Sequence, residues 1–131
     1  MASDLENPRA SKPALWTGRV ISALPVLMML AGAVFSFVKP EAARKGMVEH
    51  GYAAHHAMPI IVVELCCVLL YVIPQTAVLG AILLTGYLGG ATATHVRVDE
   101  AFIMPVVVGV LVWLGLYLRE PRLRALLPLR R

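Results

Sequence analysis

The chain has 131 residues, of which 59% are hydrophobic and only 15% are charged, and its mean hydropathy is +0.75. This composition excludes an ordinary soluble domain and indicates an integral membrane protein. The net charge of +4 does not call for a nucleic-acid partner, because membrane topology accounts for an excess of basic residues, and we expect no nucleic-acid binding.

Four long apolar runs occupy residues 20–38, 58–73, 76–94 and 101–118, and Glu64 alone interrupts them with a charge. As helices, these runs would each be roughly 24 to 29 Å long, close to the hydrocarbon thickness of a bilayer. We therefore predict an all-α fold, a bundle of four transmembrane helices at about 15–38, 57–73, 76–95 and 101–118. The whole chain, residues 1–131, forms one membrane domain in this prediction. We expect the first run to be retained as a helix rather than cleaved as a signal peptide, because it continues through Val38.

The segment between the first two predicted spans reads KPEAARKGMVEHGY, residues 39–52. Pro40 suits the first turn of a helix, Glu41 follows it there, and Gly51 favours a helix end. We predict a short interfacial helix from about Glu41 to His50 on the outer face. Pro74 and Gln75 alone join the second and third spans, which must therefore be antiparallel neighbours.

Basic residues are distributed unequally between the two sides of this arrangement. With four spans, both ends of the chain lie on one side of the membrane, and that side holds eight of the twelve Lys and Arg residues: Arg9, Lys12, Arg19, Arg119, Arg122, Arg124, Arg130 and Arg131. The positive-inside rule then predicts cytoplasmic termini. The basic tail, residues 119–131, should lie against anionic lipid headgroups, with a plain topology anchor as the simpler interpretation.

Glu64 is the most informative residue of the predicted spans. An ionisable carboxylate inside a membrane is unfavourable and usually faces a cavity or a partner. Cys67 and Tyr71 follow it at helical spacing on one face, and Thr92 and His95 share roughly one face of the third span. Glu64 and His95 would thus meet in the outer half of the bundle.

We predict a ligand site there, with Glu64 and His95 as candidate catalytic groups. The predicted ligand-binding residues are Glu64, Cys67, Tyr71, Thr92, His95 and Arg97. Structural interpretations stay open for each: Glu64 as an acid that locks two helices, His95 as an interfacial cap, and Arg97 as an anchor or a partner of Asp99.

The stretch GYLGGATATH, residues 86–95, contains small residues four apart. The pairs Gly86 with Gly90 and Gly89 with Ala93 favour close approach of another helix. Such a surface serves packing within one chain and between chains equally well, so the oligomeric state stays open.

No metal site is expected. His50, His55 and His56 are close in sequence, but their spacing does not place them on one helix face, and we interpret them as an exposed loop. Cys66 and Cys67 are adjacent and should pack as small apolar groups. The sequence contains no phosphate-binding, dinucleotide-binding or haem-attachment motif.

The stretch TAVLGAILLTGYLGGATATHVR, residues 76–97, preceded by VELCCVLLYVIPQ, resembles the DoxX-like family of small four-helix membrane proteins. The resemblance extends over roughly residues 15–130. It implies a bacterial inner membrane and a family whose name comes from a quinone-linked sulfur-oxidising enzyme, with some members associated with redox-stress complexes. The family-like positions are Glu64, Tyr87, Gly89, Gly90, Thr94, His95 and Arg97.

Two main functions follow as expectations. In the first, an outer-half cavity holds a small lipophilic molecule such as a quinone; Glu64 exchanges a proton, His95 bonds a carbonyl or relays the proton, and Arg97 favours anionic forms. In the second, the protein is a non-catalytic scaffold or assembly subunit, with a second copy or a redox protein as its partner. A transporter or lipid isomerase that uses the same acid and histidine is a third interpretation.

Overall fold

The computed structural model describes residues 9–130, and all regular structure within that range is helical, without a strand. Residues 1–8 and Arg131 lie outside the described range. The four long helices are α1 (Lys12–Val38), α3 (Ala57–Val72), α4 (Ala77–Arg97) and α5 (Ile103–Arg119). Shorter elements are α2 (Pro40–Glu49), α6 (Pro121–Leu126) and the 3₁₀ turns η2 (Ala54–His56) and η3 (Pro74–Thr76). The all-α prediction is confirmed.

The helix ends follow from local sequence. Ser11 caps α1, its hydroxyl accepting from the Ala14 amide at 3.4 Å, and α2 begins at Pro40. Helix α2 ends where Gly51 adopts a positive φ of 81°. The tight turn predicted between the second and third spans is the 3₁₀ turn that begins at Pro74.

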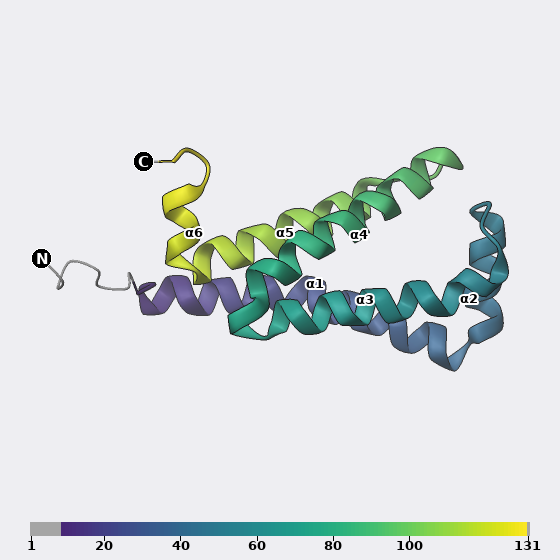
Figure 1. Cartoon of the computed structure of the whole chain (residues 1–131), viewed down its shortest axis with the longest axis horizontal. Helices are drawn as coiled ribbons and strands as arrows, with labels where there is room; N and C mark the ends of the chain where they lie inside the picture. The colour runs from purple at the N-terminus through teal and green to yellow at the C-terminus, as the bar shows by residue number, and fades with distance from the viewer. Residues whose placement is uncertain (1–8, 131) are drawn as a thin grey trace, which may run out of the picture.

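The four long helices form a ring around the core. Helix α1 packs against α5 and α3, and α4 packs against the other sides of α3 and α5. In Figure 1 the start of α1 lies at the same end of the bundle as α6, while α2 lies at the opposite end. The largest fully buried side chains include Tyr71, Leu84, Val112 and Leu116, one or more from each of α3, α4 and α5.

Close helix contacts occur at glycines other than those of the 86–95 stretch. A Cβ atom on Gly18 of α1 would lie 2.8 Å from the carbonyl oxygen of Gly115 in α5. A Cβ atom on Gly80 would collide with the backbone of Tyr71. Real Cβ atoms essentially never come this close to other atoms. The close packing of α1 against α5 and of α3 against α4 therefore depends on these glycines.

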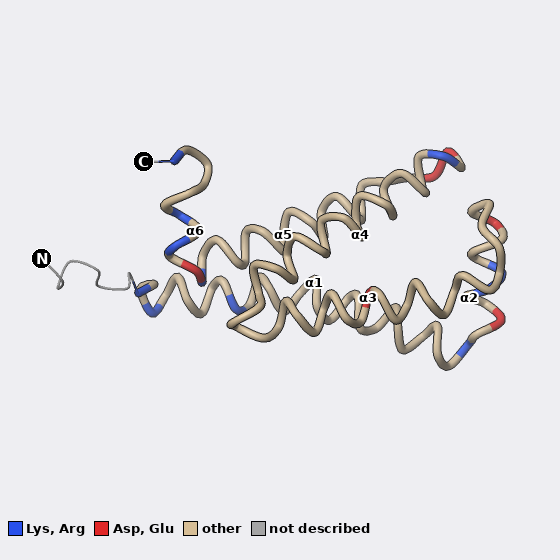
Figure 2. Tube along the Cα trace, viewed as in Figure 1, with Lys and Arg blue, Asp and Glu red and all other residues tan. Residues whose placement is uncertain are grey.

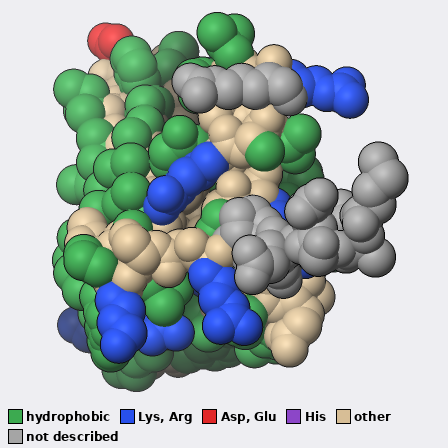
Figure 3. Space-filling model, turned by 90° about the vertical axis from the view of Figure 1, so that its left-hand side faces the viewer, with side chains coloured by type: hydrophobic (Ala, Val, Ile, Leu, Met, Phe, Trp, Pro, Cys, Tyr) green, Lys and Arg blue, Asp and Glu red, His purple; other side chains and the backbone are tan. Residues whose placement is uncertain are grey.

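The surface of the bundle suits a lipid environment. Within residues 9–130, three helical stretches are long and apolar enough to cross a membrane, namely Lys12–Val38, Ala54–Val72 and Pro74–Arg97, and α5 is a shorter apolar helix. Large side chains such as Leu27 and Val34 are more than half exposed. Charged residues gather at the two ends of the bundle (Figure 2), and basic side chains are prominent on the end where α1 begins and α6 lies (Figure 3).

Candidate functional site

A cavity of about 410 Å³ lies at the end of the bundle that carries α2, between α2, α3 and α4. We call it the outer cavity. Its walls are apolar or small at Met47, Ile60, Val63, Gly86, Gly90 and Ala91, and its polar groups are His50, Tyr52, Tyr87, Thr94 and His95. Val63 is 52% exposed, so one wall reaches the outer surface of the bundle. This volume falls within the range of small-molecule sites.

The inner polar group of the outer cavity is a pair formed by α3 and α4. The Tyr87 hydroxyl donates a hydrogen bond to Glu64 Oε2 at 3.1 Å. Glu64 is half-buried among apolar residues of α3; Tyr87 lines the cavity, and Glu64 lies behind it rather than among the lining residues. A carboxylate and a phenol at this depth each need a polar partner, and each supplies one to the other.

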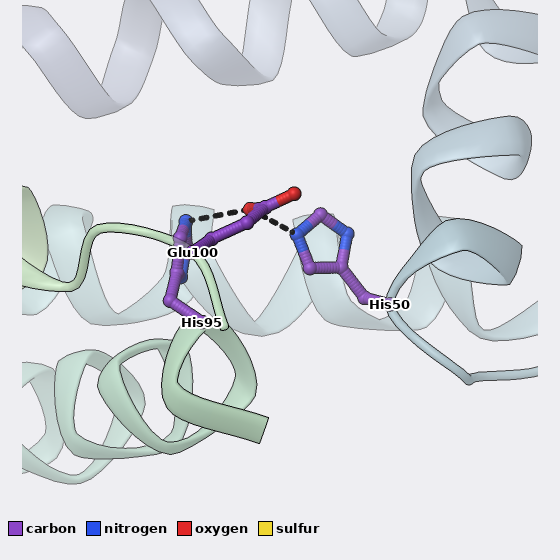
Figure 4. A group of neighbouring side chains, drawn as sticks. All are labelled: His50, His95 and Glu100. Carbon is purple, nitrogen blue, oxygen red and sulfur yellow. Dashed lines mark hydrogen bonds and ion pairs between the residues drawn. The ribbon is translucent and has the colours of Figure 1, made fainter. Parts of the chain in front are cut away.

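The outer polar group is a cluster of His50, His95 and Glu100 (Figure 4). Glu100 Oε2 lies 3.0 Å from His50 Nε2 and 4.0 Å from His95 Nε2, and the two imidazole rings are 5.5 Å apart. Two hydrogen bonds raise the pKa of His50 above its ordinary value. The bond to the Gly46 carbonyl has the larger effect, and the bond to Glu100 adds to it. On α4, His95 lies eight residues beyond Tyr87, about 12 Å along the axis, so the two polar groups stand at opposite ends of one cavity.

Arg97 holds the segment after α2 against the end of α4. Its Nη2 donates to the carbonyl oxygens of His50 at 3.0 Å and Gly51 at 3.4 Å. Its guanidinium lies 5.0 Å from the centre of the Tyr52 ring, and the Tyr52 hydroxyl lies 2.9 Å from Thr94 Oγ1. These contacts favour a positioning role for Arg97 over the Asp99 partnership considered from sequence.

The other predicted ligand residues lie elsewhere. Tyr71 is fully buried in the core, where its hydroxyl donates to the Val112 carbonyl at 2.7 Å and lies 2.9 Å from Ser22 Oγ. Cys67 is buried in the same core cluster. Thr92 lines a different cavity, so the shared face predicted for Thr92 and His95 does not bring them to one site.

That second cavity, about 650 Å³, lies along α4 and α5, and we call it the α4–α5 groove. Its lining is almost entirely apolar and includes Leu88, Gly89, Thr92, Gly109 and Trp113. The Trp113 indole donates to Thr85 Oγ1 at 2.7 Å. The groove and the outer cavity are lined by different residues of α4, so they open on different sides of this helix.

The helix contact predicted for the 86–95 glycines does not occur within the described range of the chain. A Cβ atom on Gly86, Gly89 or Gly90 would meet nothing within 4 Å apart from its own helix and chain neighbours. Gly86 and Gly90 face the outer cavity, and Gly89 faces the α4–α5 groove. The small residues thus provide space beside α4 rather than contact with a neighbouring helix of the same chain.

Comparison with known proteins gives a family match over residues 20–115, described as the DoxX-like family. This range contains both polar groups of the outer cavity and all four long helices in whole or in large part. The chain belongs to the DoxX-like family. No curated protein and no solved structure matches it significantly.

The sequence of this DoxX-like protein identified Glu64 and His95 and predicted that they meet, whereas Glu64 accepts from Tyr87 and His95 lies beside Glu100. Tyr87 appeared only as a family-like position, although a tyrosine inside a span, like a glutamate, requires a polar partner. His50 was grouped with His55 and His56, whereas the rings of those two residues lie beside each other, with their centroids 4.2 Å apart and their planes tilted by 47°. The actual neighbours of His50 are His95 and Glu100. They are distant in sequence, so local spacing does not indicate them.

Proposed function

We propose that this DoxX-like protein crosses a bacterial inner membrane four times, with both termini in the cytoplasm, and binds a small lipophilic molecule such as a quinone in the outer cavity. In this proposal α5 is the fourth span and α2 lies at the outer membrane interface. The concentration of basic residues at the end where α1 begins and α6 lies supports the orientation (Figures 2 and 3).

The hydrogen bond between Tyr87 and Glu64 carries the binding proposal. An acid inside an apolar helix is unfavourable unless a partner or a ligand uses it, and here its partner Tyr87 lines the outer cavity, whose wall on α3 is apolar at Ile60 and Val63. A lipophilic molecule with a polar head matches that surface, because the walls bind its apolar part and few polar groups orient the head.

The polar groups at the two ends of the outer cavity have different roles in this proposal. Tyr87 and Glu64 would hydrogen-bond one oxygen of the head and exchange its proton. His95, about 12 Å outward along α4, would bond the opposite end or pass the proton to the aqueous side. Arg97 would keep α2 over the cavity through its bonds to His50 and Gly51. The redox association implied by the resemblance stays a prediction.

The two open glycines of α4 provide the test. Gly90→Leu would fill the outer cavity, and Gly89→Leu would place the same side chain in the α4–α5 groove. Native mass spectrometry with lipid extraction, on protein purified gently from its own membranes, should find a stoichiometric lipophile with the wild type and with Gly89→Leu but not with Gly90→Leu. Bulk phospholipid alone on the wild type would contradict the proposal.

The α4–α5 groove favours a second candidate function, that of a membrane scaffold or assembly subunit. Its floor carries Gly89 and Gly109, and small residues on a membrane helix allow another helix to approach. A partner helix would lie there without any chemistry.

The same pair of variants tests this alternative with the opposite outcome. Gly89→Leu should dissociate a complex recovered in mild detergent, while Gly90→Leu should leave it intact. A complex that survives Gly89→Leu would remove the groove as its interface.

A further inference from the structure

The cluster of His50, His95 and Glu100 is built by two similar helix ends. In α2 the amides of Gly51 and Tyr52 donate to Val48 and Met47, with Gly51 at positive φ, and His50 closes the helix. This pattern is a Schellman motif, in which a residue at positive φ reverses the chain.

Helix α4 ends in the same way. The amides of Asp99 and Glu100 donate to the carbonyls of Val96 and His95, at 3.2 and 2.9 Å, and Asp99 takes the positive φ of 59°. Aspartate tolerates that conformation better than most residues. The reversal returns Glu100 beside His95, the residue whose carbonyl its amide contacts, and Figure 4 shows its carboxylate between the two imidazoles.

The tautomers of both histidines follow from their backbone contacts. His50 Nδ1 lies 2.6 Å from the Gly46 carbonyl oxygen, and His95 Nδ1 lies 2.7 Å from the Ala91 carbonyl oxygen. A carbonyl oxygen only accepts, so each Nδ1 carries a proton and donates it. Each Nε2 is then left for another interaction, and both face Glu100 Oε2.

This arrangement has the features of a metal centre. A neutral Nε2 turned toward a carboxylate oxygen needs a positive species between the two atoms, either a proton or a metal ion. Histidines that bind metal typically donate their other ring N–H to a carbonyl or carboxylate, which fixes the ring. Two histidines and one carboxylate are the protein ligands of many zinc and iron sites.

We propose that His50, His95 and Glu100 bind one divalent first-row metal ion, such as Zn²⁺, at the mouth of the outer cavity. The three ligand atoms already lie within 4.8 Å of one another. Zinc–ligand bonds of about 2.0 Å in a tetrahedral site place ligand atoms about 3.3 Å apart. The separations of 3.0 and 4.0 Å from Glu100 reach that value with side-chain movements of an ångström or less.

The surroundings support a preformed site with access for an ion. The side chains of His50 and His95 are 23% and 33% exposed, and that of Glu100 is 53% exposed. Arg97 fixes the backbone of His50, and a Cβ atom on Gly51 would collide with Arg97. The positive φ of 81° favours glycine at this position, and the flexible Arg97 side chain would have to move to admit a Cβ atom.

A bound ion would join the end of α2 to the end of α4 and leave a coordination position free. His50 and His95 line the outer cavity, so that position would adjoin the space assigned above to a lipophilic molecule. With the ion bound, His95 Nε2 would be a metal ligand, so the molecule would meet the ion there instead of the imidazole. The ligands of the ion itself belong wholly to the chain.

Titration of the full-length protein with Zn²⁺ tests the proposal, after chelation and removal of any affinity tag, in detergent micelles. Isothermal calorimetry should give one ion per chain, and Co²⁺ should give a visible absorption band that Zn²⁺ abolishes. His95→Gln and Glu100→Gln should each weaken Zn²⁺ binding at least as much as loss of an outer-shell partner does, about 10- to 100-fold.

Two neighbouring substitutions serve as matched controls. Asp99→Asn removes the adjacent carboxylate and keeps a residue that tolerates positive φ, and His55→Gln removes an imidazole outside the cluster. Both should bind Zn²⁺ like the wild type. Zn²⁺ should raise the melting temperature of the wild type and of these controls but not of Glu100→Gln, whose folding is checked by its far-UV spectrum.

Three results would overturn the proposal. They are the absence of stoichiometric binding to the wild type, unchanged affinity in a folded His95→Gln, and an equal loss of affinity in His55→Gln. The first would leave a proton between His50 and Glu100 and make the cluster an ordinary ion pair. None of these results bears on the lipophile in the outer cavity, which the glycine variants test separately.

Discussion

Tyr87 of α4 and Glu64 of α3 are joined by a 3.1 Å hydrogen bond at the wall of the outer cavity. These two antiparallel helices are thus joined by a polar contact among apolar side chains. The hydrogen bond could hold the two helices together or present polar atoms to a ligand. Single substitutions distinguish these two roles.

Glu64→Gln keeps the size of the side chain and an oxygen that accepts from Tyr87, but removes the proton-exchanging group. We expect the bundle to stay folded and the affinity for a quinone to fall about tenfold, the value of one hydrogen bond of about 1.4 kcal/mol. Tyr87→Phe should have a similar effect. Fluorescence quenching on titration of purified protein with a quinone measures the affinity of both variants, and the melting temperature of each is the control for folding. A lower melting temperature with unchanged quinone affinity would assign the pair to structure alone.

Tyr71→Phe should affect stability rather than ligand binding, although the sequence grouped this residue with Glu64. The substitution removes the 2.7 Å hydrogen bond to the Val112 carbonyl, which keeps its helical bond within α5, so the free energy of unfolding should fall by about 0.5 to 1.5 kcal/mol. Denaturation in detergent should show the loss, while the quinone affinity stays at the wild-type value. Tyr117→Phe, on the partly buried edge of the core, is the matched control. Weaker quinone binding by a folded Tyr71→Phe would return this residue to the site.

Gly80→Ala and Gly86→Ala make the same change on one helix and should have opposite effects. At Gly80 the new methyl group would meet the backbone of Tyr71, and such overpacking destabilises by about 1 to 3 kcal/mol. At Gly86 the methyl group would enter open space, so the higher helix propensity of alanine should stabilise by up to about 1 kcal/mol. Thermal unfolding of the two variants side by side measures the contrast. Equal melting temperatures would mean that α3 and α4 do not approach closely at Gly80.

The helices and their order were predictable because local chemistry defines them. Each long helix coincides with an apolar run, Pro40 and Gly51 bound α2, and Pro74 begins the turn before α4. These signals act within a few residues and need no knowledge of the packing.

The rotation of each helix was not predictable in the same way. Helix α4 is apolar on nearly every side, since lipid, core and cavity all accept the same side chains, and hydropathy does not show which face meets which. The glycines at 86, 89 and 90 were therefore assigned to helix packing, while Gly80 makes the close contact. Thr92 and His95 were likewise placed together, and they line different cavities.

The contacts within the cluster of His50, His95 and Glu100 were not predictable for a different reason. His50 and Glu100 are 50 residues apart and meet through two helix ends. One of these ends uses Asp99 at positive φ where glycine is usual. A glycine there would have indicated the reversal; aspartate gives a weaker signal.

The proposed orientation places Lys45 of α2 on the outer face of the inner membrane and Lys12, at the start of α1, on the cytoplasmic face. Single cysteines at these positions, Lys45→Cys and Lys12→Cys, test this in a background with Cys66 and Cys67 replaced by alanine. A membrane-impermeant maleimide added to intact spheroplasts should label Lys45→Cys, whose native side chain is well exposed in its ion pair with Glu49, and should label Lys12→Cys only after lysis. Labelling of both in lysed cells controls for reactivity. Labelling of Lys12→Cys in intact spheroplasts would reverse the orientation and place the outer cavity, with its histidines, on the cytoplasmic side.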